Sequence, residues 1–79
     1  MDGKKQMSTE KQAAVAAWTV LLDDRFALME NPGSQHKALL VSAHALHRSH
    51  VINDEDLSDM LELADGALAY AVEVQTGEY

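Results

Sequence analysis

Cysteine is missing from this chain, and its absence excludes several kinds of chemistry at once. Disulfide bonds, thiolate metal sites and a cysteine nucleophile are all ruled out. A domain of 79 residues buries only about 60% of the surface of its unfolded chain. Domains of this size therefore often depend on disulfide bonds, a structural metal or a second subunit. The lack of cysteine is also compatible with a reducing compartment, and we expect the protein to be cytoplasmic.

Long apolar runs are scarce as well. The best candidate for a secretory or membrane segment is residues 13–22, which follow Lys4 and Lys5. This run has about half of the ~20 residues that cross a bilayer, and Asp23 and Asp24 close it without a small-residue cleavage site. We therefore expect no signal peptide and no contact with a membrane.

Basic residues are few, with 6 Lys and Arg against 13 Asp and Glu, and the formal net charge is −7. Direct binding of nucleic acid needs a basic footprint for the phosphates, so we do not expect it. The charges are also segregated along the chain. The segment from Asn31 to Asn53 holds no acid but contains Lys37, Arg48 and all 4 histidines, whereas the chain beyond Asn53 has many acids and no Lys or Arg.

Apolar residues recur at helical spacing along most of the chain, and no stretch alternates like a strand. The single proline stands in the turn segment 31–34, whose Ser34 is placed to cap the helix that follows. Asn53 is a favourable N-cap with acids in the next turn, and Gly77 is a typical stop. The pattern predicts an all-α fold, a small antiparallel three-helix bundle. The helices are expected over about residues 10–30, 35–49 and 54–75.

The expected domain layout follows from these helices. Residues 1–7 are polar and aperiodic and should form a flexible N-terminal tail. Residues 8–76 should form a single helical domain, and residues 77–79 a loose C-terminus. The predicted core stripe of the first helix consists of Val15, Trp18, Leu22, Phe26 and Met29.

The expected helix over residues 54–75 is the most strongly amphipathic part of the chain. Its apolar residues span an arc of roughly 200°, wider than the stripe of about 100° that one neighbour needs. Apolar burial stabilises by about 25 cal/mol per Å², so we expect a symmetric homodimer, unless the excess apolar face binds a different protein. The expected interface residues are Trp18, Arg25, Met60, Leu63, Ala67, Leu68 and Ala71.

The opposite side of this helix is acidic and contains two small residues. Its residues are Asp59, Glu62, Asp65, Gly66, Ala69 and Glu73. One interpretation is that this face binds a protein partner with a basic or apolar surface. The other is that its acids attract the basic residues and histidines of the neighbouring helix. Gly66 costs about 0.5–1 kcal/mol relative to Ala in mid-helix, and it is either tolerated or marks the close approach of another backbone.

Arg25 is the unusual residue of the first helix, because it falls on the apolar side of the helical pattern. A charge in that position needs a partner or a path to solvent. Its stem can cover the edge of the core while the guanidinium reaches water. Alternatively, the guanidinium can pair with a carboxylate of the third helix or of a second subunit.

Three histidines follow the pattern H-x-x-H-x-x-H, as His44, His47 and His50. Neighbours three apart on a helix lie close enough to hold one metal ion together. The two outer histidines point about 120° apart, so a third ligand would have to come from Asp54, Asp56 or another subunit. We therefore favour histidines that are solvated or cap the helix end, and we expect no metal and no other cofactor.

The residues in these patterns indicate binding rather than catalysis. No local arrangement of Ser, His and acid residues activates a nucleophile, so we do not expect an enzyme. The predicted function is a small acidic helical module, a regulator or adaptor that acts by binding another protein. One alternative is an acidic inhibitor that occupies a basic nucleic-acid-binding site of its target, and the other is a histidine-based metal-binding protein.

Overall fold

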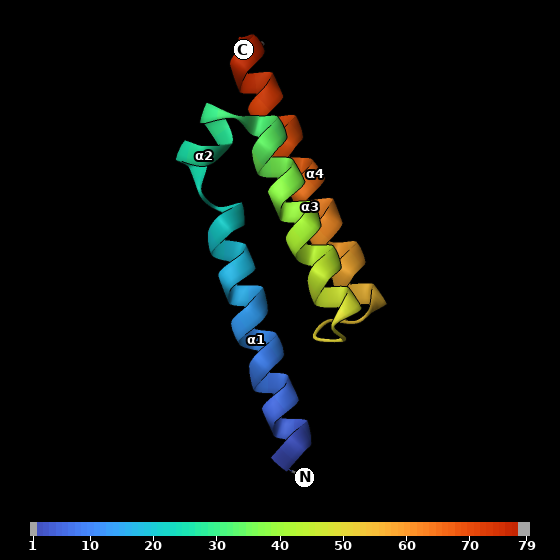
Figure 1. The fold of residues 1–79 in the computed structure, drawn as a ribbon. Helices are drawn as coiled ribbons and strands as arrows, with labels where there is room; N and C mark the ends of the chain where they lie inside the picture. The colour runs from blue at the N-terminus through green and yellow to red at the C-terminus, as the bar shows by residue number, and fades with distance from the viewer. Residues whose placement is uncertain (1, 78–79) are drawn as a thin grey trace.

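Four α-helices make up the part of the chain that the structure describes (Figure 1). The computed structural model describes the backbone of residues 2–77 and the side chains of residues 9–77. The helices are α1 (Asp2–Leu22), α2 (Arg25–Glu30), α3 (Pro32–Arg48) and α4 (Asp54–Thr76), with no strand among residues 2–77. The predicted all-α fold is confirmed, although four helices replace the expected three. Residue 1 and residues 78–79, which belong to the expected loose ends, lie outside the described residues.

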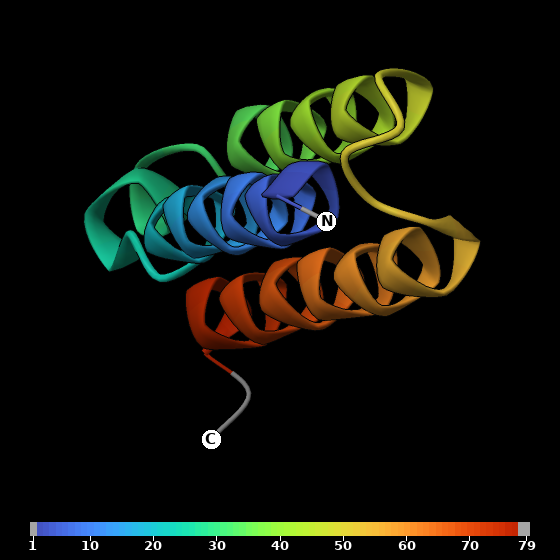
Figure 2. The same ribbon diagram turned by 90° about the horizontal axis from the view of Figure 1, so that it is seen from below.

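The helices α3 and α4 run antiparallel side by side, and α1 lies across this pair (Figures 1 and 2). α1 runs antiparallel to α3 and contacts both α3 and α4, while the short α2 packs on α3 and α4 at one end of the bundle. The N-terminal part of α1 extends past the α3–α4 connection, and the molecule measures 52 × 20 × 18 Å. α3 and α4 each contact all three other helices.

The helix that was expected over residues 10–30 is interrupted at Asp23 and Asp24. Two carboxylates at the C-terminal end of α1 are unfavourable beside the negative end of the helix dipole. The Asp24 side chain instead accepts a hydrogen bond from the Ala27 backbone N–H at 3.0 Å and becomes the N-cap of α2. α1 also begins at Asp2, well before the expected start near residue 10, so it includes most of the segment expected to be a flexible tail.

α2 has 6 residues and is too short to be stable without its neighbours. Leu28 is its buried residue, whereas Phe26 is 77% exposed. The predicted core position of Phe26 was therefore wrong, because the break changes the side of the chain that faces the bundle. Gln75 of α4 donates from its Nε2 to the backbone O of Met29 at 2.5 Å, which provides a partner for a carbonyl at the end of α2.

Two side chains, those of Gln35 and Trp18, form hydrogen bonds between α1 and α3. Gln35 is buried with 6% exposed, and its Nε2 donates to the backbone O of Leu21 at 2.5 Å. The Nε1–H of Trp18 donates to the backbone O of Leu39 at 3.0 Å. Both bonds pair polar groups that burial would otherwise leave unsatisfied, so they determine how α1 lies along α3.

α3 begins three residues earlier than the expected start at residue 35. Asn31, rather than Ser34, is the N-cap, and its side chain accepts a hydrogen bond from the Ser34 backbone N–H at 3.3 Å. Pro32 occupies the first helical turn, where a missing N–H costs nothing because that group has no partner within the helix. The proline therefore starts the helix that it was expected to precede.

Both ends of α4 agree with the sequence prediction. The Asn53 side chain accepts a hydrogen bond from the Asp56 backbone N–H at 2.8 Å, and the Asp56 carboxylate accepts one from the Asn53 backbone N–H at 3.1 Å. This reciprocal pair is a capping box. Gly77 ends the helix with φ of 71°, a left-handed conformation that glycine adopts without strain.

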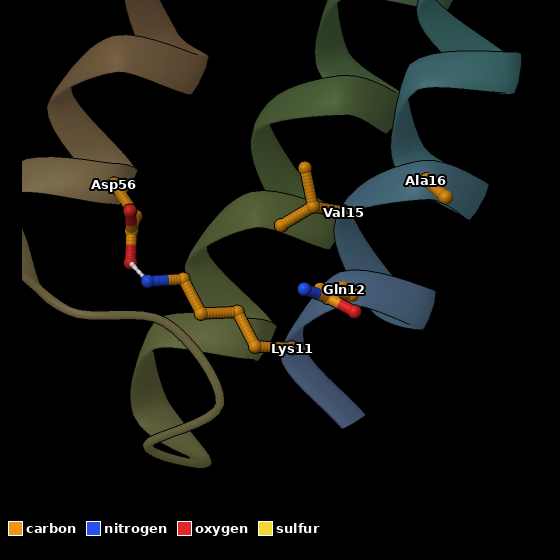
Figure 3. Close-up of a pocket in the computed structure, with 5 residues that line it drawn as sticks. All are labelled: Lys11, Gln12, Val15, Ala16 and Asp56. Atoms are coloured by element: carbon orange, nitrogen blue, oxygen red, sulfur yellow. Dashed lines mark ion pairs between the residues drawn. The ribbon is translucent and has the colours of Figure 1, made fainter. Parts of the chain in front are cut away.

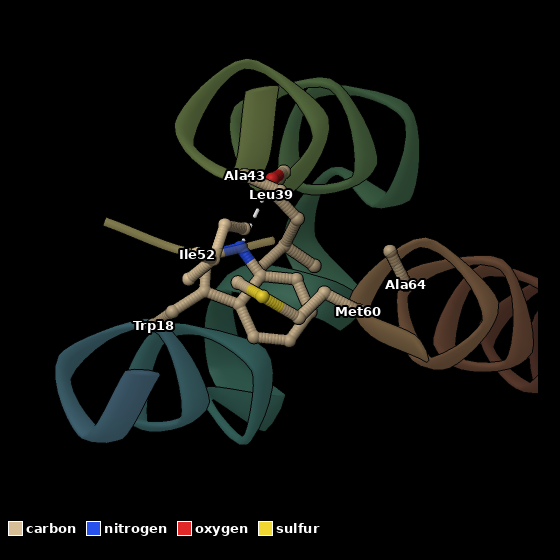
Figure 4. Packing of buried hydrophobic residues seen from close by; sticks show 6 residues of the cluster. All are labelled: Trp18, Leu39, Ala43, Ile52, Met60 and Ala64. Atoms are coloured by element: carbon tan, nitrogen blue, oxygen red, sulfur yellow. Dashed lines mark hydrogen bonds between the residues drawn. The ribbon is translucent and has the colours of Figure 1, made fainter. Parts of the chain in front are cut away.

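The hydrophobic core lies where α1, α3 and α4 meet (Figure 4). Its buried residues are Trp18, Leu39, Ala43, Ile52, Met60 and Ala64. Figure 4 shows the Trp18 ring pointing from α1 toward the other two helices, with the Met60 side chain beside it. Ala43 and Ala64 are fully buried, and their small size lets neighbouring helices pack closely.

Candidate protein-interaction surface

All acids of α4 except Glu55, which is exposed in the first turn, fall into an inner set and an outer set. The inner acids pair with α1 and α3, as Asp54 with His47 at 2.5 Å, Asp56 with Lys11 at 2.7 Å and Asp65 with His36 at 2.8 Å. Two of these contacts, those of the histidines, join α3 to α4 and are ion pairs when the histidine is protonated. The polar contacts between α3 and α4 are therefore present within the chain, and both are made by histidines rather than by Lys37 or Arg48.

Asp56 is held by both α1 and its own helix cap. The hydrogen bond from Lys11, followed by the one from the backbone N–H of Asn53, lowers the pKa of the Asp56 carboxyl from its ordinary value of 3.8. Burial acts in the opposite direction, and the charge of Lys11 adds a further lowering of this pKa. The carboxylate therefore stays ionised near neutral pH and ties the start of α4 to α1.

The outer acids of α4 face solvent. Asp59 and Glu62 are exposed, and their side chains join none of the ion pairs or hydrogen bonds in the part of the chain that the structure describes. Glu73 is exposed on the same side of the helix. Gly66 and Ala69 are exposed between these acids, and a Cβ added at Gly66 would meet no atom within 4 Å. This part of α4 is therefore a charged surface, and its centre, at Gly66 and Ala69, carries no large side chain.

Asp65 differs from the other residues predicted to bind a partner. Its carboxylate contacts His36 of α3, although its side chain remains 71% exposed. It therefore belongs to the inner set, and a partner could reach it only at the edge of the outer surface.

An exposed apolar stripe borders the outer acids. Leu63 is 54% exposed, Tyr70 43% and Val74 37%, and Ala67 is half-buried. These four residues recur every three or four positions, which places them within about 60° around the helix. We call Leu63, Ala67, Tyr70 and Val74 the α4 stripe. Large apolar residues gathered on one helix face, rather than scattered singly, indicate an interaction site.

The α4 stripe forms one wall of a cleft beside α2. This α2–α4 cleft has a volume of about 220 Å³. It is lined by Leu22, Asp23, Arg25, Leu28, Leu63, Ala67 and Tyr70. At its rim, the guanidinium carbon of Arg25 lies 5.8 Å from the centroid of the Tyr70 ring, a cation–π contact. Arg25 is exposed and joins none of the ion pairs among the described residues, so it follows the predicted path to solvent.

The residues predicted for a homodimer interface do not share one surface. Trp18, Met60 and Ala71 are buried inside the single chain, with exposed fractions of 3%, 4% and 0%. They pack the bundle itself, so a second copy could not contact them in this arrangement. Leu68 is half-buried elsewhere on α4. The remaining three, Arg25, Leu63 and Ala67, all line the α2–α4 cleft.

A larger hollow, of about 500 Å³, lies between α1 and the start of α4 (Figure 3). It is lined by Lys11, Gln12, Val15, Ala16 and Asp56. Figure 3 shows its two charged side chains reaching toward each other across the gap, where they form the ion pair described above. A charged ligand would have to break that pair, so we assign no binding function to this hollow.

The histidines of the H-x-x-H-x-x-H pattern are spread over α3 and the connection that follows it. His47 contacts Asp54, His44 is exposed, and His50 lies beyond the end of α3 with φ of 63°. His47, His50 and Asp54 line one hollow of about 480 Å³. Nevertheless, among the side chains of residues 9–77, no three metal-ligating groups are close enough together to hold an ion. A metal ion held by these histidines would therefore need a further ligand from another subunit.

The sequence pattern identified the acidic side of α4 but did not separate the α4 stripe from the core. The predicted dimer interface includes Leu63 and Ala67, whereas Tyr70 and Val74 belong to no predicted site. The spacing i, i+4, i+7 and i+11 is visible in the sequence. The sequence does not distinguish the α4 stripe from the core, because the apolar arc of α4 includes both a buried side and an exposed side. No polar residue separates the two sides.

Comparisons with protein-family models, curated proteins and solved structures find no match to this chain. Within residues 2–77, each helix is too short or too polar to cross a membrane.

Proposed function

We propose that this protein is a small acidic interaction module, a regulator or adaptor that acts by binding another protein through α4. The binding surface consists of the outer acids, the open positions between them and the adjoining α4 stripe. The partner that fits this surface carries basic residues around an apolar ridge. The proposal includes no catalytic step and no cofactor, and it places the protein in the cytoplasm, with which a chain without cysteine is compatible.

One observation carries this proposal, namely that the acids of α4 are not all used inside the molecule. The inner acids pair with α1 and α3, whereas Asp59 and Glu62 extend into solvent on the same helix as the exposed Leu63 and Tyr70. Apolar residues in the centre and charges around them are the usual plan of a protein–protein interface.

The acidic-inhibitor alternative is supported less well by the spacing of the outer acids. Glu62 and Glu73 lie about three turns apart, roughly 16 Å at 1.5 Å per residue, with Gly66 and Ala69 between them. Phosphates recur about every 3.4 Å along one strand of a nucleic acid. The outer acids therefore reproduce a row of phosphates poorly, and the α4 stripe has no counterpart in such a row.

The homodimer stays a prediction, but its interface has to move to the α4 stripe, because the core residues first expected there are buried. A twofold axis at the stripe would place two helices that carry the same outer acids, Asp59, Glu62 and Glu73, side by side. Each chain also carries a net charge of −7. Self-association through the stripe is thus opposed by charge, whereas binding of a basic partner is favoured by it.

The test of the proposed function is capture of a partner from cells of the native host. The bait is the full chain, compared with the double variant Asp59→Asn, Glu62→Gln. A matched control, Glu10→Gln with Glu30→Gln, removes the same charge from exposed positions of α1 and α2. We expect the control to retain the captured partner and the α4 variant to lose it, with capture weakening as salt is added. Equal capture by all three proteins would show that the outer acids do not bind the partner.

A further inference from the structure

The α2–α4 cleft adds a mainly apolar recess to the charged surface of α4. Its volume of about 220 Å³ is below the ~300–1,000 Å³ of pockets that hold small molecules. It suits a single large side chain instead. Its walls are mainly apolar, since Leu22, Leu28, Leu63 and Ala67 line it, with Tyr70 at the rim. We propose that the cleft receives one apolar side chain of a basic amphipathic helix that lies along α4, an inference that rests on the proposed function.

The α4 stripe indicates that the bound segment is a helix. Leu63 and Ala67 line the cleft, and the stripe continues through Tyr70 to Val74, over roughly 16 Å at 1.5 Å per residue. This length matches anchors at positions i, i+4, i+7 and i+11 of a docked helix. An extended peptide would need a sheet edge for its backbone hydrogen bonds, and residues 2–77 contain no strand.

The charges around the cleft select a basic occupant. Asp23 lines the cleft itself, and Asp59 and Glu62 lie on α4 beside the stripe. Arg25 is the basic residue of the lining, and its guanidinium is placed over the Tyr70 ring at the rim. Lysines and arginines on either side of the apolar anchor would therefore meet carboxylates, whereas an acidic helix would be repelled.

A second copy of this chain is a poorer occupant. Its α4 carries the same acids, so two such helices repel each other. The outer face of α3 is the closest approach to a basic helix in the chain, with Lys37 and Arg48 exposed on it. On that face, within the described residues, Val41 is the one large apolar residue exposed, so it offers one anchor where the stripe accommodates several.

The test uses a synthetic peptide of about 18 residues, roughly five helical turns, with leucines at i, i+4, i+7 and i+11 and lysines at most other positions. Its binding to the full chain is measured by fluorescence anisotropy. We expect Leu63→Asp and Ala67→Gln each to weaken binding about tenfold or more. The loss from Leu63→Asp should occur although the new carboxylate attracts the peptide. Val41→Asp, the matched control, adds the same charge on α3 and should leave the affinity unchanged or slightly raised.

Circular dichroism and thermal unfolding establish that each variant is folded. Leu63 is 54% exposed and Tyr70 43%, so Tyr70→Ala at the rim provides a further variant that the fold should tolerate. A peptide with its leucines replaced by serines should bind about tenfold more weakly to the unmutated chain. Equal binding of the two peptides would overturn the cleft proposal, because it would mean that charge alone binds them.

The outcomes also separate this inference from the proposed function. If the cleft variants bind like Val41→Asp while Asp59→Asn with Glu62→Gln weakens binding, the cleft proposal is overturned and the acidic surface stands. If neither set changes the affinity, both fail. If sedimentation equilibrium shows a dimer that Val41→Asp dissociates, α3 of a second copy occupies the surface, and the basic-helix proposal is overturned.

Discussion

Trp18 connects the core to the backbone of a neighbouring helix. Its ring is 3% exposed, and its Nε1–H donates to the backbone O of Leu39. Trp18 and Gln35 provide side-chain hydrogen bonds between α1 and α3, and Trp18 also fills the core, so the docking of α1 depends strongly on Trp18.

We expect Trp18→Ala to destabilise the protein by about 3–5 kcal/mol, the usual cost of removing a large buried aromatic side chain. Whole domains are stable by only about 5–15 kcal/mol, and small ones lie near the lower end, so much of the variant should be unfolded at room temperature. Urea unfolding followed by circular dichroism measures the change. Val20→Ala, on the same helix at 72% exposed, should shift the midpoint little. Similar midpoints for the two variants would contradict the position of Trp18 in the core.

Gly66 and Gly77 should respond in opposite directions to the same substitution. Gly66→Ala should stabilise by about 0.5–1 kcal/mol, since alanine is the better helix former and a Cβ there meets no atom within 4 Å. Gly77→Ala should destabilise, because φ of 71° is strained for any residue with a Cβ. Thermal unfolding of the two variants beside the unmutated chain tests both. A loss of stability in Gly66→Ala would show that this position is not open.

At the scale of helices, the ends were predictable where neighbouring residues determine them. Asn53 and Asp56 cap each other, and Gly77 terminates α4 by its own conformational freedom, so both ends could be predicted from the sequence. The break at residues 23–24 could not, because apolar periodicity continues through it. It depends on the Asp24 cap and on Gln75, a residue of α4 that reaches the end of α2.

The candidate binding site also has one part that the sequence predicts and one part that it does not. The outer acids follow from the helical pattern of α4 alone, and the structure places Asp59 and Glu62 in solvent as that pattern implies. The α2–α4 cleft needed the positions of α2 and α4 relative to each other, which depend on the break. The same break explains why Phe26, on the predicted core stripe, is exposed while Leu28 is buried.

The contact between α1 and the start of α4 should depend on pH through Asp56. Its folded-state pKa is lowered, chiefly by Lys11, so the stabilisation it provides is fully present above the ordinary value of 3.8. It is lost as pH falls through the folded-state pKa. We expect Lys11→Met to lower the free energy of unfolding near neutral pH and the difference from the unmutated chain to shrink below about pH 4.

Urea unfolding at a series of pH values measures this difference. Lys37→Met, which removes the same charge from an exposed position of α3, serves as the control and should show no such pH dependence relative to the unmutated chain. A Lys11→Met effect that persists unchanged into strong acid would indicate lost packing rather than a lost ion pair.

At the scale of the whole molecule, salt should act in opposite directions on the two kinds of association. Added salt weakens the attraction of a basic partner, but it also screens the repulsion between two chains of net charge −7. In sedimentation equilibrium we expect a mass near 8.7 kDa at low salt, rising toward that of a dimer as salt increases. Binding of the lysine peptide should weaken over the same range. A mass that stays at 8.7 kDa at every salt concentration would contradict the homodimer.

The projection of α1 beyond the α3–α4 connection has a hydrodynamic consequence. The radius of gyration is 14.3 Å, whereas a compact domain of this length would have about 11.6 Å. A rod-like body experiences more friction than a sphere of equal mass, so the protein should diffuse slowly for its size. A single chain should therefore elute from a size-exclusion column ahead of a spherical standard of the same mass, and this early elution reflects its axial ratio rather than the number of chains.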